Sequence, residues 1–191
     1  MRITGYLFTF LILLICRQAR SAQHTDEDYV LVVHSINFNE TWTHQTYETI
    51  QTLITQEGLQ VKGEELQIPI IKDTTEILNK LAHLREEYPL PPRAVVCIGD
   101  PAWLVSRPLF DNEWKDVPSL ICYSQGMVPR NIEAMVDRNL GFREAMIPTS
   151  EMIKGYNVTT LRQPLYVRET IETIRKIQPE LKKIAFICDN R

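Results

Sequence analysis

Residues 94–102, which read Ala-Val-Val-Cys-Ile-Gly-Asp-Pro-Ala, decide the fold of this chain. The first five are apolar without a polar residue between them, which is typical of a strand buried on both faces of a parallel sheet. Asp100-Pro101 then predicts a helix start, because the carboxylate can cap a helix and proline suits its first position. A buried strand followed at once by a helix is the repeating unit of parallel α/β proteins.

The same pattern occurs twice more along the chain. Residues 29–33 are apolar and end in a polar cluster at 34–37, and residues 119–122 end in a second cluster at 123–126. Further strands are predicted at 60–68, 156–159 and 184–188, and helices at 41–57, 73–88, 131–138 and 163–179. This order predicts a doubly wound α/β domain with a mostly parallel sheet, whose ligands bind outside the carboxyl ends of the strands.

Composition narrows the classes of function. The chain has 191 residues, 44% of them apolar, which is enough for one ordinary core. A net charge of -3 gives no electrostatic reason to expect a nucleic-acid partner. The four histidines lack metal-site spacing, so we expect neither a metal nor another cofactor.

The first 21 residues are typical of a secretory signal peptide. Arg2 supplies a positive start, residues 6–16 are apolar, and Ala19 and Ser21 are small residues placed for cleavage before Ala22. We therefore expect export to the periplasm, with an uncleaved inner-membrane anchor as the alternative. Export permits disulfides, and a Cys97–Cys122 bridge between neighbouring strands is conceivable, although buried apolar cysteines are more often core residues.

Four stretches resemble one family. Residues 30–37 (VLVVHSIN) followed by Trp42, residues 94–102, residues 117–123 (VPSLICY) and residues 179–189 (PELKKIAFICD) resemble the ABC-transporter substrate-binding family of the tryptophan/tyrosine type. Those proteins have a type I periplasmic-binding fold, and related domains serve as sensor regions of two-component histidine kinases, the group this chain resembles most.

The resemblance implies a domain organisation. Residues 22–158 would form the first ligand-binding lobe, and residues 159–191 a crossover helix and the first strand of a second lobe. The rest of that lobe, and any membrane and kinase region, would lie outside these residues. No kinase motif occurs within them.

The resemblance also implies where a ligand would bind. Contacts are expected in three loops, at Ser35, Asn37 and Trp42, at Gly99, Asp100, Pro101 and Ala102, and at Tyr123, Ser124 and Gln125. Independently, a helix N-terminus at 100–102 offers N–H groups to an anion, and an aromatic ring at 42 or 123 could form a pocket wall. The expected ligand is an amino acid or another small, anionic solute.

The leading expectation is a non-catalytic sensing lobe, in which ligand stabilises a closed two-lobe form. A transporter's solute-binding protein is the first alternative. A small α/β hydrolase is the second, disfavoured because neither Ser35 nor Ser124 lies in a Gly-x-Ser-x-Gly elbow. Three single residues also have structural roles as alternatives to ligand contact. Asp100 would cap a helix, His34 would be a hydrogen-bonded structural histidine, and Trp42 would pack in the core.

Overall fold

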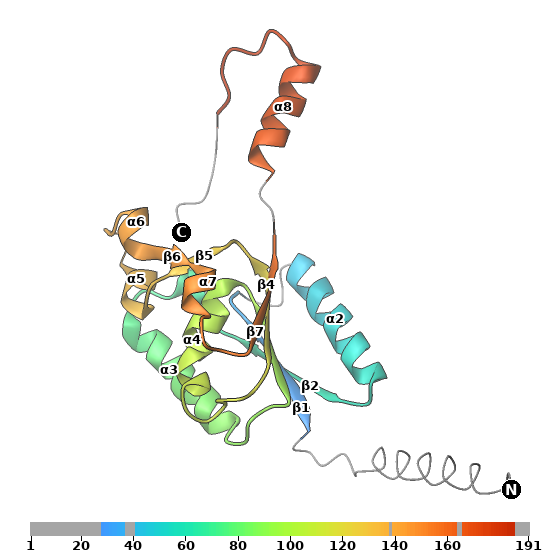
Figure 1. The fold of residues 1–191 in the computed structure, drawn as a ribbon, viewed down its shortest axis with the longest axis vertical. Helices are drawn as coiled ribbons and strands as arrows, with labels where there is room; N and C mark the ends of the chain where they lie inside the picture. The colour runs from blue at the N-terminus through green and yellow to red at the C-terminus, as the bar shows by residue number, and fades with distance from the viewer. Residues whose placement is uncertain (1–27, 37–40, 138, 164–165, 186–191) are drawn as a thin grey trace, which may run out of the picture.

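A computed structural model describes residues 28–36, 41–137, 139–163 and 166–185 (Figure 1). Its centre is a parallel sheet with the strand order β2-β1-β3-β4-β7. The strands are β1 (Tyr29–His34), β2 (Gln60–Glu65), β3 (Ala94–Ile98), β4 (Ser119–Ser124) and β7 (Val158–Arg162). Helices flank this sheet, so the predicted doubly wound α/β fold is confirmed.

The principal helices are α2 (Thr41–Gln56), α3 (Thr74–Glu87), α4 (Asp100–Phe110) and α8 (Val167–Ile177). Between β4 and β7 the chain makes an excursion of short elements, where one short helix was predicted. They are β5 (Met127–Pro129), α5 (Ile132–Val136), α6 (Phe142–Ala145), β6 (Met146–Pro148) and α7 (Thr149–Met152), with β5 and β6 antiparallel. A 3-10 turn, Ile68–Ile70, follows β2.

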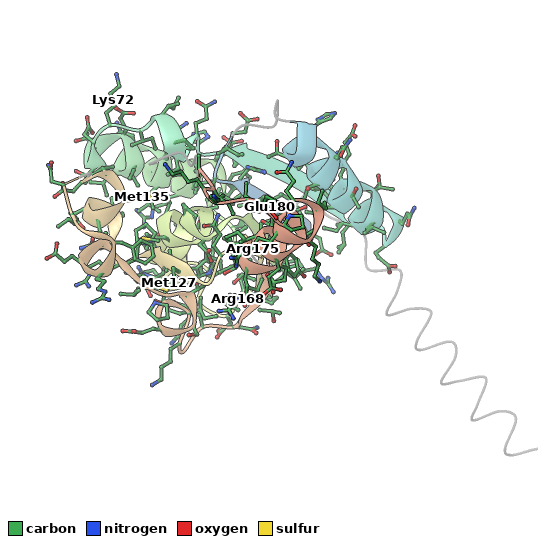
Figure 2. All side chains as sticks on the ribbon, turned by 90° about the horizontal axis from the view of Figure 1, so that it is seen from above. Lys72, Met127, Met135, Arg168, Arg175 and Glu180 are labelled. Atoms are coloured by element: carbon green, nitrogen blue, oxygen red, sulfur yellow. The ribbon has the colours of Figure 1, made fainter. Side chains whose placement is uncertain are left out.

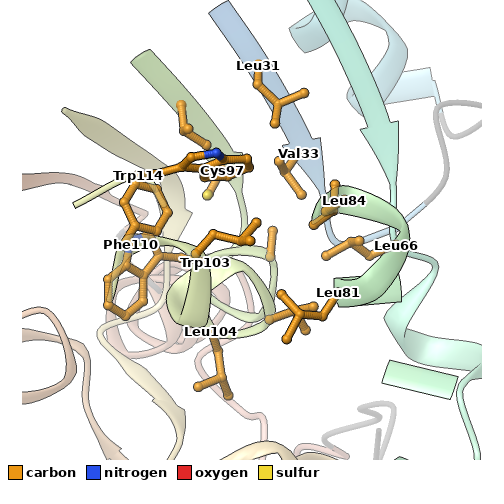
Figure 3. Packing of buried hydrophobic residues seen from close by; sticks show 14 of the residues in the cluster. Leu31, Val33, Leu66, Leu81, Leu84, Cys97, Trp103, Leu104, Phe110 and Trp114 are labelled. Atoms are coloured by element: carbon orange, nitrogen blue, oxygen red, sulfur yellow. The ribbon is translucent and has the colours of Figure 1, made fainter. Parts of the chain in front are cut away.

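The two faces of the sheet carry separate apolar clusters. Leu31 and Val33 of β1 point to the face covered by α3 and α4, where they join Trp103 and Leu84 (Figure 3). The neighbouring Val30 and Val32 point to the opposite face, against α2. Figure 1 shows α2 on one side of the sheet and α3 and α4 on the other. Burial on both faces explains why the strand sequences lack polar alternation.

Local signals in the sequence fix several helix ends. Asp73 caps α3, its Oδ1 accepting a hydrogen bond from the Glu76 N–H at 3.0 Å. Gly58 follows the end of α2 with a φ of 81°, a left-handed conformation that glycine adopts without strain. At α4 the prediction needs correction: Gly99 occupies the cap position and the helix begins at Asp100 itself. Asp100 is therefore not the N-cap.

The two strand cysteines lie on opposite faces of the sheet. In the register between β3 and β4, Cys97 pairs with Ile121 and Ile98 pairs with Cys122. Cys97 belongs to the cluster under α4, and Cys122 belongs to the cluster under α2. Both are free thiols. Their side chains cannot meet, so the conceivable Cys97–Cys122 disulfide is ruled out by the pleat of the sheet.

The chain after β4 differs in detail from the sequence expectation. β7 runs from Val158 to Arg162, whereas a strand over 156–159 was predicted. The predicted strand at 184–188 is not seen at residues 184 and 185, and its remainder lies outside the described residues. The segment 1–21 also lies outside them. Among the helices that the structure describes, none has the length and apolar character needed to cross a membrane.

Helix α8 stands away from the sheet, beyond the carboxyl end of β7 (Figure 1). All 11 residues of α8 are described, and none of them is buried. Arg168 and Arg175 lie on this helix, and Glu180 follows it (Figure 2). On the sheet itself, the side chain of Leu161 in β7 is 56% exposed, so the α2 face is only partly covered.

Candidate functional site

The carboxyl ends of β1, β3 and β4 lie side by side, which brings the three predicted loops into contact, the first two of them at Ser35 and Gly99. The Ser35 Oγ donates a hydrogen bond to the Ile98 carbonyl at 2.7 Å and accepts one from the Ala102 N–H at 3.1 Å. The same N–H, in the first turn of α4, also donates to the Gly99 carbonyl at 3.2 Å, so Ser35 is its second acceptor. Gly99 has a φ of 91°, and a Cβ there would lie 2.6 Å from the Ser35 Oγ. Glycine at 99 permits this close approach.

Asp100 joins three separate elements. Its side chain is almost fully buried, with 4% exposure. One carboxylate oxygen, Oδ2, accepts a hydrogen bond from the Gln125 N–H at 2.9 Å, and Oδ1 accepts one from the Thr149 hydroxyl at 3.2 Å. The carboxylate thus ties α4 to the turn after β4 and to α7. These hydrogen bonds stabilise the rim, which is the group of loops that follows β1, β3 and β4.

Replacing Asp100 with alanine is expected to lower the free energy of unfolding by about 2 kcal/mol, because the buried Thr149 hydroxyl and the partly buried Gln125 N–H lose a charged acceptor. Urea unfolding followed by circular dichroism measures this loss. Asp116→Ala, at an exposed position, is the matched control and should change stability by less than about 0.5 kcal/mol. Equal stability of the two variants would contradict the bridging role of Asp100.

Ser124 and Gln125 belong to the turn that Asp100 holds. The Ser124 Oγ accepts a hydrogen bond from the Gly126 N–H at 3.2 Å, and its carbonyl accepts one from the Gln163 N–H at 2.9 Å. The side chain of Gln125 is exposed. Of the other predicted contacts, Pro101 and Ala102 lie in the first turn of α4. Asn37 and the side chain of Trp42 lie outside the described residues.

Beside this rim is a groove with a volume of about 640 Å³, between α2 and the ends of β4 and β7. Its size lies within the range of small-molecule sites. The lining residues are Gln45, Thr46, Thr49, Ile50, Cys122, Tyr123, Leu161, Arg162 and Gln163. Tyr123 is the predicted contact that lines it. The lining residues of α2 were not among the predicted contacts, and those of β7 were missed because the predicted strand ended at 159.

Tyr123 has an unusual backbone conformation at the edge of the groove. Its φ is 59°, which is rare for a bulky residue and costs free energy. The strain coincides with a shift in the pairing register of β4 and β7 between Cys122 and Ser124. The Tyr123 hydroxyl shares a hydrogen bond with the Thr46 Oγ1 at 2.9 Å. The irregular strand end therefore holds the phenol across the groove, against α2.

The groove combines an apolar floor with polar edges. Ile50, Cys122 and Leu161 supply apolar surface, while the amides of Gln45 and Gln163 and the hydroxyls of Thr46 and Thr49 supply hydrogen-bonding groups. Burial raises the pKa of the Cys122 thiol, so it remains protonated. The surface favours binding a molecule with an apolar body.

The described residues form no group of three or more histidines, cysteines and acids that could hold a metal ion. The Ser35 and Ser124 hydroxyls both engage backbone groups, as given above. No family model, curated protein or solved structure matches this chain.

Proposed function

We propose that this chain is a non-catalytic ligand-binding lobe, the first half of a two-lobe receptor of the type I periplasmic-binding kind. In this proposal it is the exported sensing end of a two-component histidine kinase. The observation that carries it is the groove at the carboxyl edge of the parallel sheet, bounded by the strained Tyr123. That edge is where open α/β sheets bind small molecules.

Two exposed apolar surfaces support the proposal that a second lobe covers this one. Leu161 forms part of the groove yet remains more than half exposed, and no residue of the fully described helix α8 is buried. Apolar side chains of this kind are stabilised when a further layer covers them. Closure of a second lobe over the groove would bury ligand and Leu161 together. Because ligand would then favour the closed form, its binding energy becomes the signal.

The proposal is tested by isothermal titration calorimetry of the purified chain with L-tryptophan and L-tyrosine, the solutes that the family resemblance suggests. A single lobe should bind one of them with a dissociation constant of about 1 mM, or about -4 kcal/mol. Thr49→Trp, which places a large ring in the groove from an exposed position of α2, should abolish this binding.

Thr52→Trp is the matched control, because Thr52 is exposed on the same helix and does not line the groove. It should bind as the unmodified chain does. Absence of binding for both amino acids, or equal binding by the two tryptophan variants, would contradict the proposed site.

A further inference from the structure

Arg162, at the carboxyl end of β7, gives the groove its charge. Among the lining residues, all of which the structure describes, Arg162 carries a formal charge and none is acidic. The carboxylate of Asp100 does not line the groove, and its two oxygens accept hydrogen bonds from Gln125 and Thr149. Within the described residues, no carboxylate forms an ion pair with Arg162. The lining of the groove therefore carries one formal positive charge and no negative one.

The guanidinium of the exposed Arg162 lies against the turn after β4. A Cβ at Gly126 would lie 2.9 Å from the Arg162 Nη2 and 3.0 Å from its Nε, so the guanidinium packs directly on the glycine backbone. Gly126 has a φ of 81°, which a side chain would strain. Glycine at 126 therefore leaves room for the guanidinium beside the groove.

We propose that the groove binds a small carboxylate with an apolar body, and that Arg162 binds the carboxylate. This inference rests on the proposed function and adds the residue that recognises the acid group of the ligand. Guanidinium groups bind carboxylates through two parallel N–H···O bonds, which gives both affinity and orientation. The side-chain amide of Gln163, the next residue, can donate to the same group. Ile50 and Leu161 then contact the apolar body of the ligand.

The location of Arg162 differs from the anion site that the sequence pattern predicts. The pattern at 100–102 points to the N-terminus of α4, where the Ala102 N–H donates to Ser35 and the carboxylate of Asp100 lies nearby. Pro101 has no N–H to offer. A negative ligand is therefore better stabilised at Arg162, which lies against Gly126.

Calorimetry with a matched pair of probes tests the inference. 3-Phenylpropanoate and 3-phenylpropanamide share an apolar body and differ in charge. The acid should bind at least about tenfold more tightly than the amide, a difference of about 1.4 kcal/mol. Arg162→Gln should remove that difference by weakening the acid alone. Arg162→Lys, which keeps the charge without the planar pair of donors, should give an intermediate affinity.

Arg143→Gln is the control, since it removes the same charge from an exposed position on α6. It should leave both affinities unchanged. Equal binding of acid and amide, both blocked by Thr49→Trp, would overturn the role of Arg162 while the ligand-binding function stands. Competition by inorganic phosphate as strong as by the acid would show a general anion site and overturn the carboxylate assignment. Failure of both probes and both amino acids to bind would overturn the proposed function itself.

Discussion

Trp103→Ala is expected to lower the free energy of unfolding by about 3–5 kcal/mol, the loss typical of a large ring removed from a packed core. Trp103 lies on α4 with 1% exposure. Its ring stacks with Phe110 at a centroid distance of 6.2 Å and meets Tyr156 edge-on at 5.1 Å. The indole thus joins α4 to the segment that leads into β7. Urea unfolding by circular dichroism measures the effect.

Two variants show whether the loss comes from this packing. Trp103→Phe keeps a ring and removes an indole N–H that has no acceptor among the described residues, so it should lose less than the alanine variant. Leu78→Ala removes an apolar side chain that is 52% exposed on α3 and should cost less than about 1 kcal/mol. A loss for Trp103→Ala as small as for Leu78→Ala would contradict the described core.

Lowering the pH from 7 to 4 is expected to destabilise the fold by about 3 kcal/mol through His34 alone. Burial of the imidazole lowers the pKa of His34 from 6.5 to about 4, against a smaller opposing effect of the Glu65 charge. The Ile36 N–H donates to the His34 Nδ1 at 3.1 Å, a bond that requires this nitrogen to be unprotonated.

The direction in which stability changes with pH follows from proton binding. Between pH 6.5 and 4 the unfolded chain holds a proton on His34 that the folded chain does not, so stability falls as pH falls. The pKa difference of about 2.5 corresponds to about 3 kcal/mol. This stability is fully present above pH 6.5.

Unfolding in urea at several pH values measures the effect of His34. His34→Gln should flatten the dependence between pH 6.5 and 4, because glutamine does not titrate. His44→Gln, at an exposed position on α2, should keep the dependence of the unmodified chain. Identical pH profiles for the two variants would show that His34 does not titrate as its burial requires.

The sequence predicted the centre of the sheet well for a physical reason. β1, β3 and β4 are buried on both faces, so their apolar runs are continuous and easy to recognise. β7 is an edge strand with exposed residues, and its sequence VTTLR gives no such run. The strand was therefore placed too early, at 156–159, and its lining residues were missed.

The candidate site was less predictable because its contacts join residues distant in the sequence. Ser35 and Asp100 are recognisable as polar residues at strand ends, but their partners in the fold decide what they do. Both stabilise the rim through hydrogen bonds within the protein. The groove itself forms between α2 and β7, which no local pattern relates. The close approach of the Arg162 guanidinium to Gly126 is visible only in the folded structure.

Intermolecular nuclear Overhauser effects between a bound probe and the chain give the most direct test of the groove as the ligand site. With 3-phenylpropanoate bound, we expect contacts from its ring protons to the methyl groups of Ile50 and Leu161 and to the ring of Tyr123. Contacts to methyl groups elsewhere, such as those of the exposed Leu78, with none to Ile50 or Leu161, would contradict the account.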